Sequence, residues 1–145
     1  MTNKRASAGH LLSTPHEAMI AALRERHPNV QTAGFFRALA ECGEYMRDLL
    51  KHDPEWRASI NIVPDAFAID RIGKHVSVFE VVDTHDIPAS KVEAVAEIGW
   101  ALDQDGYDIA IIRVDRHGST LIDPVGDELA RLSSPIPDTL NAGEL

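Results

Sequence analysis

Two apolar runs separated by a helical segment constrain this chain most. Residues His75–Val82 are rich in β-branched side chains, and Tyr107–Val114 is almost continuously apolar, as is typical of a strand covered on both faces. Between them a helix is predicted over residues 90–105, capped by Ser90 and ended by Gly106. A strand, a helix and a strand of these lengths form a right-handed parallel crossover. The pattern therefore predicts an α/β protein.

A shorter run, Asp65–Asp70, stands before the first of these strands and predicts a β-hairpin. If residues 71–74 form its turn, Asp65 lies opposite Glu80, and alternation places both on one face of the sheet. The remaining residues of that face are apolar: Phe67, Ile69, Val76, Val78 and Val82. Directly opposed residues have β-carbons about 4.5–5.5 Å apart, so two carboxylates there repel each other, and a divalent cation between them would remove the repulsion. In the alternative interpretation, Asp65 accepts backbone hydrogen bonds in a turn and Glu80 points into water.

The residues before the hairpin predict two helices and one more strand. Thr14 and Pro15 suit the start of a helix that ends at His27. Apolar residues at spacings of three and four predict a second helix over residues 33–51. Alternation predicts a strand over residues 56–63. The predicted fold class is therefore α/β, with a mixed sheet, flanking helices and a core of the order α-β-β-β-α-β.

The chain length of 145 residues suits one domain. We expect a flexible arm over residues 1–12 and a single α/β domain over residues 13–126. A short helix and a tail are predicted for residues 127–145, where prolines interrupt the pattern.

Charge and cysteine content restrict the function and the location. Lys and Arg number 14 against 23 Asp and Glu, a net charge of −9, which argues against broad nonspecific binding to nucleic acid. The negative net charge does not exclude a nucleic-acid enzyme, because a bound metal can outweigh the mean charge at the site. Cys42 is the single cysteine, which favours a reducing compartment and an inert buried thiol. No apolar run approaches the roughly 20 residues of a membrane span. We therefore expect a cytoplasmic protein without a membrane partner, and the oligomeric state stays open, a homodimer included.

The acid pair sits in a recognisable order of elements. Pro64-Asp65, fourteen intervening residues, Glu80 at the end of an apolar strand, and then a helix and an apolar strand resemble the PD-(D/E)XK, or restriction-endonuclease-like, superfamily. The resemblance covers roughly residues 33–114. It implies a nuclease in which Asp65, Glu80 and the carbonyl of Val81 bind Mg²⁺ or Mn²⁺. The motif lysine is replaced by Val82, and in some members of the superfamily that lysine is displaced to the following helix, as Lys91 would be here.

Two further residues are candidates for the same site, and two functions are open. Glu44, on the predicted second helix, resembles the acid that the first helix of the superfamily often contributes. His85, just beyond the Glu80 strand, has the chemistry of a general base or a metal ligand. Both also fit ordinary exposed positions. The first hypothesis is a metal-dependent nuclease that acts on nucleic-acid phosphodiesters through Asp65, Glu80 and Lys91. The alternative is a catalytically inactive nuclease fold that acts as an acidic protein-binding or regulatory module.

Overall fold

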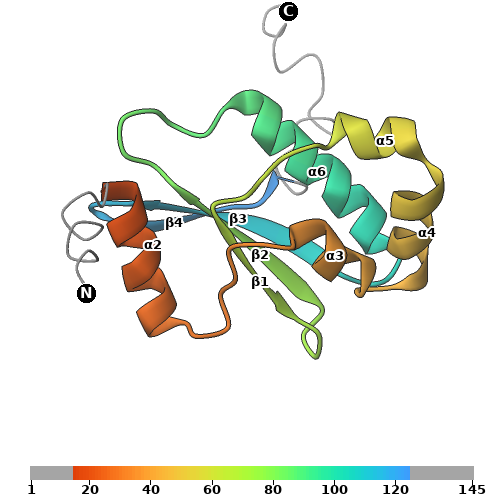
Figure 1. The fold of residues 1–145 in the computed structure, drawn as a ribbon, viewed down its shortest axis with the longest axis horizontal. Coiled ribbons are helices and arrows are strands. Elements are labelled where there is room, and N and C mark those ends of the chain that lie inside the picture. The colour runs from red at the N-terminus through yellow and green to blue at the C-terminus, as the bar shows by residue number, and fades with distance from the viewer. Residues whose placement is uncertain (1–14, 125–145) are drawn as a thin grey trace, which may run out of the picture.

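The computed structural model describes residues 15–124, which form a four-stranded mixed sheet flanked by helices (Figure 1). The strands lie in the order β1-β2-β3-β4. Helices α2, α3, α4 and α5 precede the sheet, and α6 connects its two central strands. In chain order the elements are α2 (Pro15–Arg26), α3 (Phe35–Ala40), α4 (Glu44–His52), α5 (Pro54–Ser59), β1 (Ala66–Asp70), β2 (His75–Val81), α6 (Ala89–Asp103), β3 (Asp108–Asp115) and β4 (Gly118–Ile122).

The hairpin and the crossover are confirmed. β1 pairs with β2 in antiparallel orientation with Phe67 opposite Val78, which is the predicted register. β2 pairs with β3 in parallel, and α6 makes the connection between them. β4 then returns along β3 in antiparallel orientation. One detail differs: α6 begins after Pro88, so Ser90 lies inside the first turn and is not its cap.

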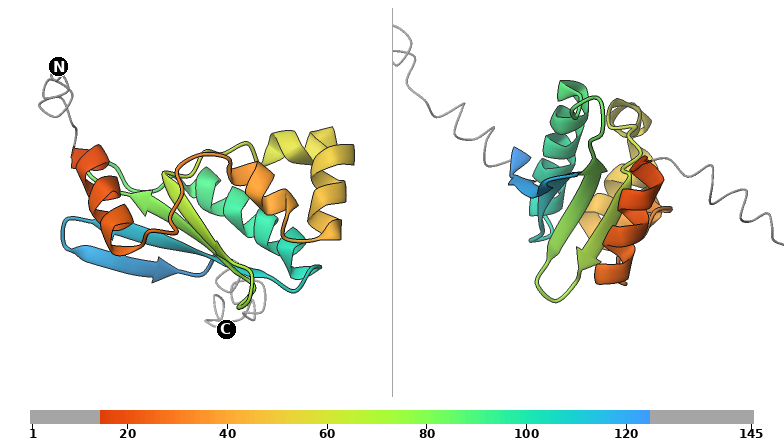
Figure 2. Two further views of the ribbon diagram at one scale, coloured as in Figure 1. Left: turned by 60° about the horizontal axis from the view of Figure 1, so that its bottom comes forward. Right: turned by 90° about the vertical axis from the view of Figure 1, so that its left-hand side faces the viewer.

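The two faces of the sheet are covered by different helices (Figure 2). α6 lies on one face, where the apolar residues of β2 and β3 pack against its buried stripe. Parts of α3 and α4 complete this larger core, whose fully buried members include Leu39, Met46, Phe67, Val76, Val78, Val95, Ile98, Leu102 and Ile111. On the opposite face α2 contributes Leu23 to a smaller cluster with Ala66, Phe79 and Val114. A large apolar side chain such as Leu or Phe contributes about 1.5–3 kcal/mol to stability when it is fully buried.

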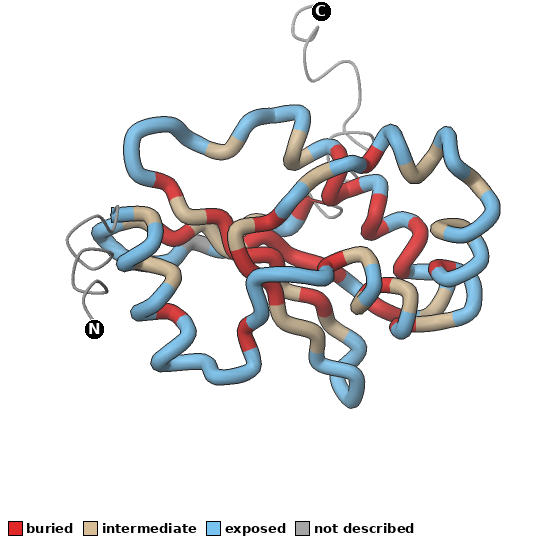
Figure 3. Tube along the Cα trace, viewed as in Figure 1, coloured by how far each residue is buried: buried red, intermediate tan, exposed pale blue. Residues whose placement is uncertain are grey.

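Burial along the chain follows this layering (Figure 3). The central strands and the inner side of α6 are buried, whereas α5 has no buried residue and α2 has one, Leu23. Among the described residues, no helix is both long enough and apolar enough to cross a membrane. The predicted arm over residues 1–12 and the predicted helix and tail over residues 127–145 lie outside the described residues.

The continuous helix predicted over residues 33–51 is wrong, because the chain breaks between α3 and α4. Gly43 is extended, and a β-carbon on it would lie 2.1 Å from Cγ of Asp105. The Asp105 carboxylate occupies that space and accepts the backbone N–H groups of Tyr45 and Met46 at 3.3 and 3.0 Å. A distant side chain therefore caps α4, and the apolar spacing could not reveal it.

The strand predicted over residues 56–63 is also wrong. Its first half belongs to α5, where Asp53 accepts the N–H of Trp56 at 3.0 Å and Pro54 takes the first helical position. This capping outweighs the alternation of the side chains. At the outer edge of β1 the described residues form only a single bridge, between Gln31 and Phe67. Two strands therefore precede α6, instead of the predicted three.

Candidate functional site

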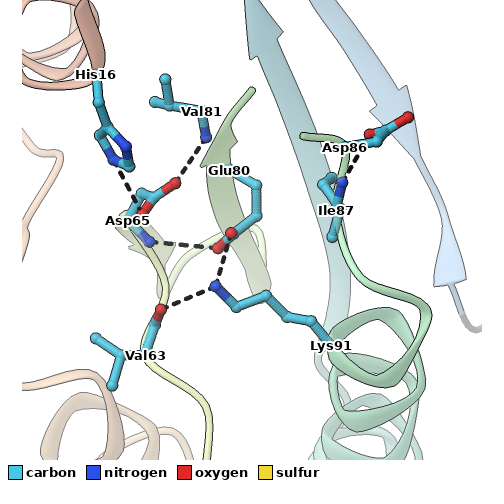
Figure 4. Close-up of polar contacts among 8 residues, drawn as sticks. All are labelled: His16, Val63, Asp65, Glu80, Val81, Asp86, Ile87 and Lys91. Atoms are coloured by element: carbon cyan, nitrogen blue, oxygen red, sulfur yellow. Dashed lines mark hydrogen bonds and ion pairs between the residues drawn. The ribbon is translucent and has the colours of Figure 1, made fainter. Parts of the chain in front are cut away.

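The two predicted acids lie together where β1 begins and β2 ends (Figure 4). Asp65 directly precedes β1, and Glu80 is the penultimate residue of β2. A carboxylate oxygen of Glu80, Oε2, accepts the backbone N–H of Asp65 at 3.3 Å. Oδ2 of Asp65 in turn accepts the N–H of Val81 at 2.8 Å. These crossed hydrogen bonds hold both carboxylates at one end of the hairpin.

Lys91 reaches this acid pair from the first turn of α6. Its Nζ donates to Oε1 of Glu80 at 2.7 Å and to the carbonyl of Val63 at 3.0 Å. The Glu80 side chain is 6% exposed and the Lys91 side chain 19%, so the ion pair is largely shielded from water. The Lys91 side chain extends from α6 toward the end of β2, so that its ammonium lies beside the Glu80 carboxylate (Figure 4). The structure thus brings Asp65, Glu80 and Lys91 into one cluster.

Burial sets the electrostatics of the cluster. Glu80 is the one charged residue in the buried class among the described residues, and its burial raises the pKa of the carboxyl above the ordinary 4.5. The hydrogen bond and charge of Lys91 act in the opposite direction and lower that pKa, while the charge of Asp65 raises it. The net shift is upward. Lys91 therefore favours the charged form of Glu80 against the effect of burial.

His16 is a fourth member of the cluster that sequence reasoning missed. It extends from the first turn of α2, and its Nε2 lies 3.1 Å from Oδ1 of Asp65 (Figure 4). Forty-eight residues lie between the two in the sequence. Nothing in the local pattern around Pro15 indicates that α2 lies against the start of β1. The tertiary fold alone makes this contact.

Arg113 on β3 is a further polar residue beside Glu80 that sequence reasoning missed. The parallel register pairs it with Glu80, so both lie on the face of the sheet that carries α6. Its guanidinium donates to Asp86 in the β2–α6 loop at 2.9 Å and to Asp115 on its own strand. The sequence predicted parallel strands but not their register, and that register is the signal that identifies Arg113.

The other candidate residues differ in their placement. Val81 borders the site through its N–H, and Val82 is buried beside it. Glu44 lies elsewhere: it begins α4 beside Asp105, beyond the far end of α6 from Lys91, and α6 is about 22 Å long. His85 is exposed in the loop, and within residues 15–124 it makes no hydrogen bond or ion pair to Asp65 or Glu80. The structure does not bring Glu44 or His85 into the cluster.

The donor set fits a hard cation that keeps much of its own hydration. Asp65 and Glu80 offer four carboxylate oxygens, and each oxygen that accepts one hydrogen bond retains a second lone pair. Mg²⁺ is typically held by one or two protein carboxylates with water and phosphate completing the shell. Within the described part of the chain, no group of three or more His, Cys, Asp or Glu residues is arranged to hold a metal. The two carboxylates alone therefore do not form a closed protein cage for a metal.

Comparisons with known proteins give no relative for this chain. No protein-family model, curated protein or solved structure matches it. The resemblance to the PD-(D/E)XK superfamily thus remains a prediction from the motif, and the function has to be argued from the geometry of the site.

Proposed function

We propose that the chain is a divalent-metal-dependent nuclease that hydrolyses phosphodiester bonds at Asp65, Glu80 and Lys91. The observation that carries the proposal is the reach of Lys91, whose Nζ lies 2.7 Å from Glu80 although Val82 occupies the usual lysine position. Two carboxylates with a lysine ammonium beside them are a suitable arrangement for the hydrolysis of a phosphodiester bond. In fold terms, β1, β2, α6 and β3 would correspond to a restriction-endonuclease-like core. The single bridge of Gln31 would take the place of its remaining strand.

Each residue of the cluster has a distinct task in this proposal. Asp65 and Glu80 would hold Mg²⁺ or Mn²⁺, which supplies a water of lowered pKa and offsets the charge of the phosphate. Lys91 would orient the attacking water or place positive charge beside the phosphate oxygens, from a side chain that the Val63 carbonyl also holds. His16 would hold one oxygen of Asp65 in place.

The test is cleavage of end-labelled DNA and RNA, single-stranded and duplex, with Mg²⁺ or Mn²⁺. Asp65→Asn and Lys91→Met should each lower the rate by about 10²–10³-fold, the usual cost of removing one preorganised stabilising group. Glu97→Gln is the matched control, because Glu97 is an exposed acid of α6 away from its first turn, and its rate should equal that of the parent. A parent protein that leaves every substrate intact, or an Asp65→Asn variant that cleaves at the parental rate, contradicts the proposal.

A second function is favoured by the internal pairing of the cluster. The oxygens of Asp65 and Glu80 already accept from His16, Val81, Lys91 and the Asp65 backbone, so the chain can stabilise both acids without a metal. A nuclease fold that has lost catalysis and binds a basic protein partner would have this property, and the net charge of −9 suits it. Under this alternative, metal leaves the melting temperature unchanged and all cleavage assays are negative.

A further inference from the structure

A pocket of about 310 Å³ lies beside the acid pair, between α3 and the segment that leads from α5 to β1. Aromatic side chains give it an apolar interior. Phe35 and Phe67 are buried. The ring of Phe35 packs edge-on against the rings of Phe36 and Phe67, with 5.2 Å between the ring centres in each pair. We call this cavity the Phe36 pocket. At Gly34 a β-carbon would meet nothing within 4 Å, so the space beside α3 is open.

The charge of the Phe36 pocket is opposite to that of the chain. Arg37 and Arg57 line it, and its lining includes no Asp or Glu, although the chain carries nine more acidic than basic residues. The guanidinium of Arg57 lies 3.7 Å from the centre of the Phe36 ring and donates to the side chain of Asn61 at 3.4 Å. The pocket thus combines an aromatic face, a planar cation and an amide. These groups stack on a flat ring and hydrogen-bond to its polar edge.

The backbone connects this pocket to the acid pair. Val63 and Pro64 line the pocket, and Asp65 follows directly. The carbonyl of Val63 accepts from Nζ of Lys91, so the same residue contacts both the pocket and the cluster. A second hollow on the other side of this segment is lined by Lys91 and Ser90. The Phe36 pocket and Asp65 are therefore adjoining parts of the same segment of backbone.

We propose that the Phe36 pocket binds an unpaired nucleobase next to the scissile phosphate, so that the substrate is a single strand or a duplex with a displaced base. The inference rests on the proposed nuclease function and names its substrate class. A base inside a duplex is stacked on both faces and cannot enter such a pocket. The Arg57 guanidinium covers one face of Phe36, so a base would stack on the other side of Arg57 or on the other face of Phe36, which every base can do, and Asn61 would add a contact to the base edge.

Binding is measured with the full chain and a fluorescent single strand of about 10 nucleotides, in Ca²⁺ and in EDTA, by anisotropy. The parent should bind the single strand more tightly than the matching duplex. Phe36→Leu, which keeps apolar volume, and Arg57→Gln should each raise Kd roughly 5- to 150-fold, the loss expected for one base stack. Arg47→Gln removes an exposed arginine of α4 that does not line the pocket, and Kd should stay within about twofold of the parent.

An oligonucleotide with an abasic site separates base recognition from charge. When the abasic site is moved along the strand, one position should weaken binding to the parent. The same position should have no further effect on binding to Phe36→Leu. Equal binding of duplex and single strand, no sensitivity to abasic sites, or equal competition by a polyglutamate peptide overturns the inference. If Phe36→Leu does not fold, the half-buried Arg57 carries the same comparison through Arg57→Gln. Base-dependent binding without cleavage refutes the nuclease alone, whereas cleavage with pocket variants that bind normally refutes the pocket alone.

Discussion

Replacement of Lys91 by Met tests how the buried acid is stabilised. The substitution keeps an unbranched apolar stem and removes the ammonium that lies 2.7 Å from Glu80. Breaking a buried ion pair by removing one partner costs about 3–5 kcal/mol. Val63 is 77% exposed, so water can replace Lys91 at its carbonyl and that contact adds little to the cost. The loss of stability therefore arises mainly at Glu80.

Protonation of Glu80 limits the size of this loss and makes it depend on pH. Protonation of a carboxyl with an ordinary pKa of 4.5 costs about 1.4 kcal/mol for each pH unit above that pKa. The loss of stability therefore cannot exceed about 4 kcal/mol at pH 7.5. At pH 5 the same limit is about 0.7 kcal/mol. Lys91→Met should thus lose about 3–4 kcal/mol at pH 7.5 and at most about 0.7 kcal/mol at pH 5.

Urea unfolding of parent and variant, followed by tryptophan fluorescence at both pH values, measures the difference. The double variant Glu80→Gln with Lys91→Met should recover most of the stability, because no buried charge is left unpaired. Lys51→Met, at an exposed position in the last turn of α4, should change stability by at most about 0.5 kcal/mol. A Lys91→Met loss that is the same at both pH values would refute the reasoning.

Three other outcomes follow from the structure. The pKa of Glu80 is raised in the folded protein, so the contribution of Glu80 to stability is fully present below pH 4.5 and is lost as pH rises through the folded pKa; Glu80→Gln should remove that part of the pH dependence in urea titrations, and an unchanged profile would contradict it. Burial raises the pKa of Cys42 to about 11, so a thiol reagent at pH 8 should label it only after denaturation, and rapid native labelling would place it at the surface. Gly43→Ala should cost about 1–3 kcal/mol by displacing the Asp105 carboxylate, and combining it with Asp105→Ala should cost much less than the sum of the two; additive losses in chemical denaturation would exclude the shared contact.

The sequence was sufficient where local pattern and turn length agree. β1 and β2 are joined by four residues, so counting outward from the turn was enough to derive the register that places Asp65 near Glu80. α6 has the length and apolar stripe of a crossover helix, and its first turn brought Lys91 to the end of β2 as expected.

The sequence was insufficient where distant residues decide local structure. The break at Gly43 depends on Asp105, sixty-two positions further along the chain, and a spacing rule cannot detect it. The same is true of His16, whose contact with Asp65 depends on how α2 packs. The error at residues 56–63 was local instead: alternation suggested a strand, while the cap at Asp53 and Pro54 started a helix.

Titration of the purified chain with Mn²⁺ tests the central claim most directly, with melting temperature and calorimetric heat as readouts. A cation shared by Asp65 and Glu80 should bind at one site per chain and raise the melting temperature as occupancy rises; at a concentration of 100 times Kd it would stabilise the native state by about 2.7 kcal/mol. Asp65→Asn should abolish both the heat and the shift, and Asp103→Asn, an exposed acid at the other end of α6, should retain them. No binding to the parent, or binding that Asp65→Asn leaves intact, would contradict a metal site at the acid pair.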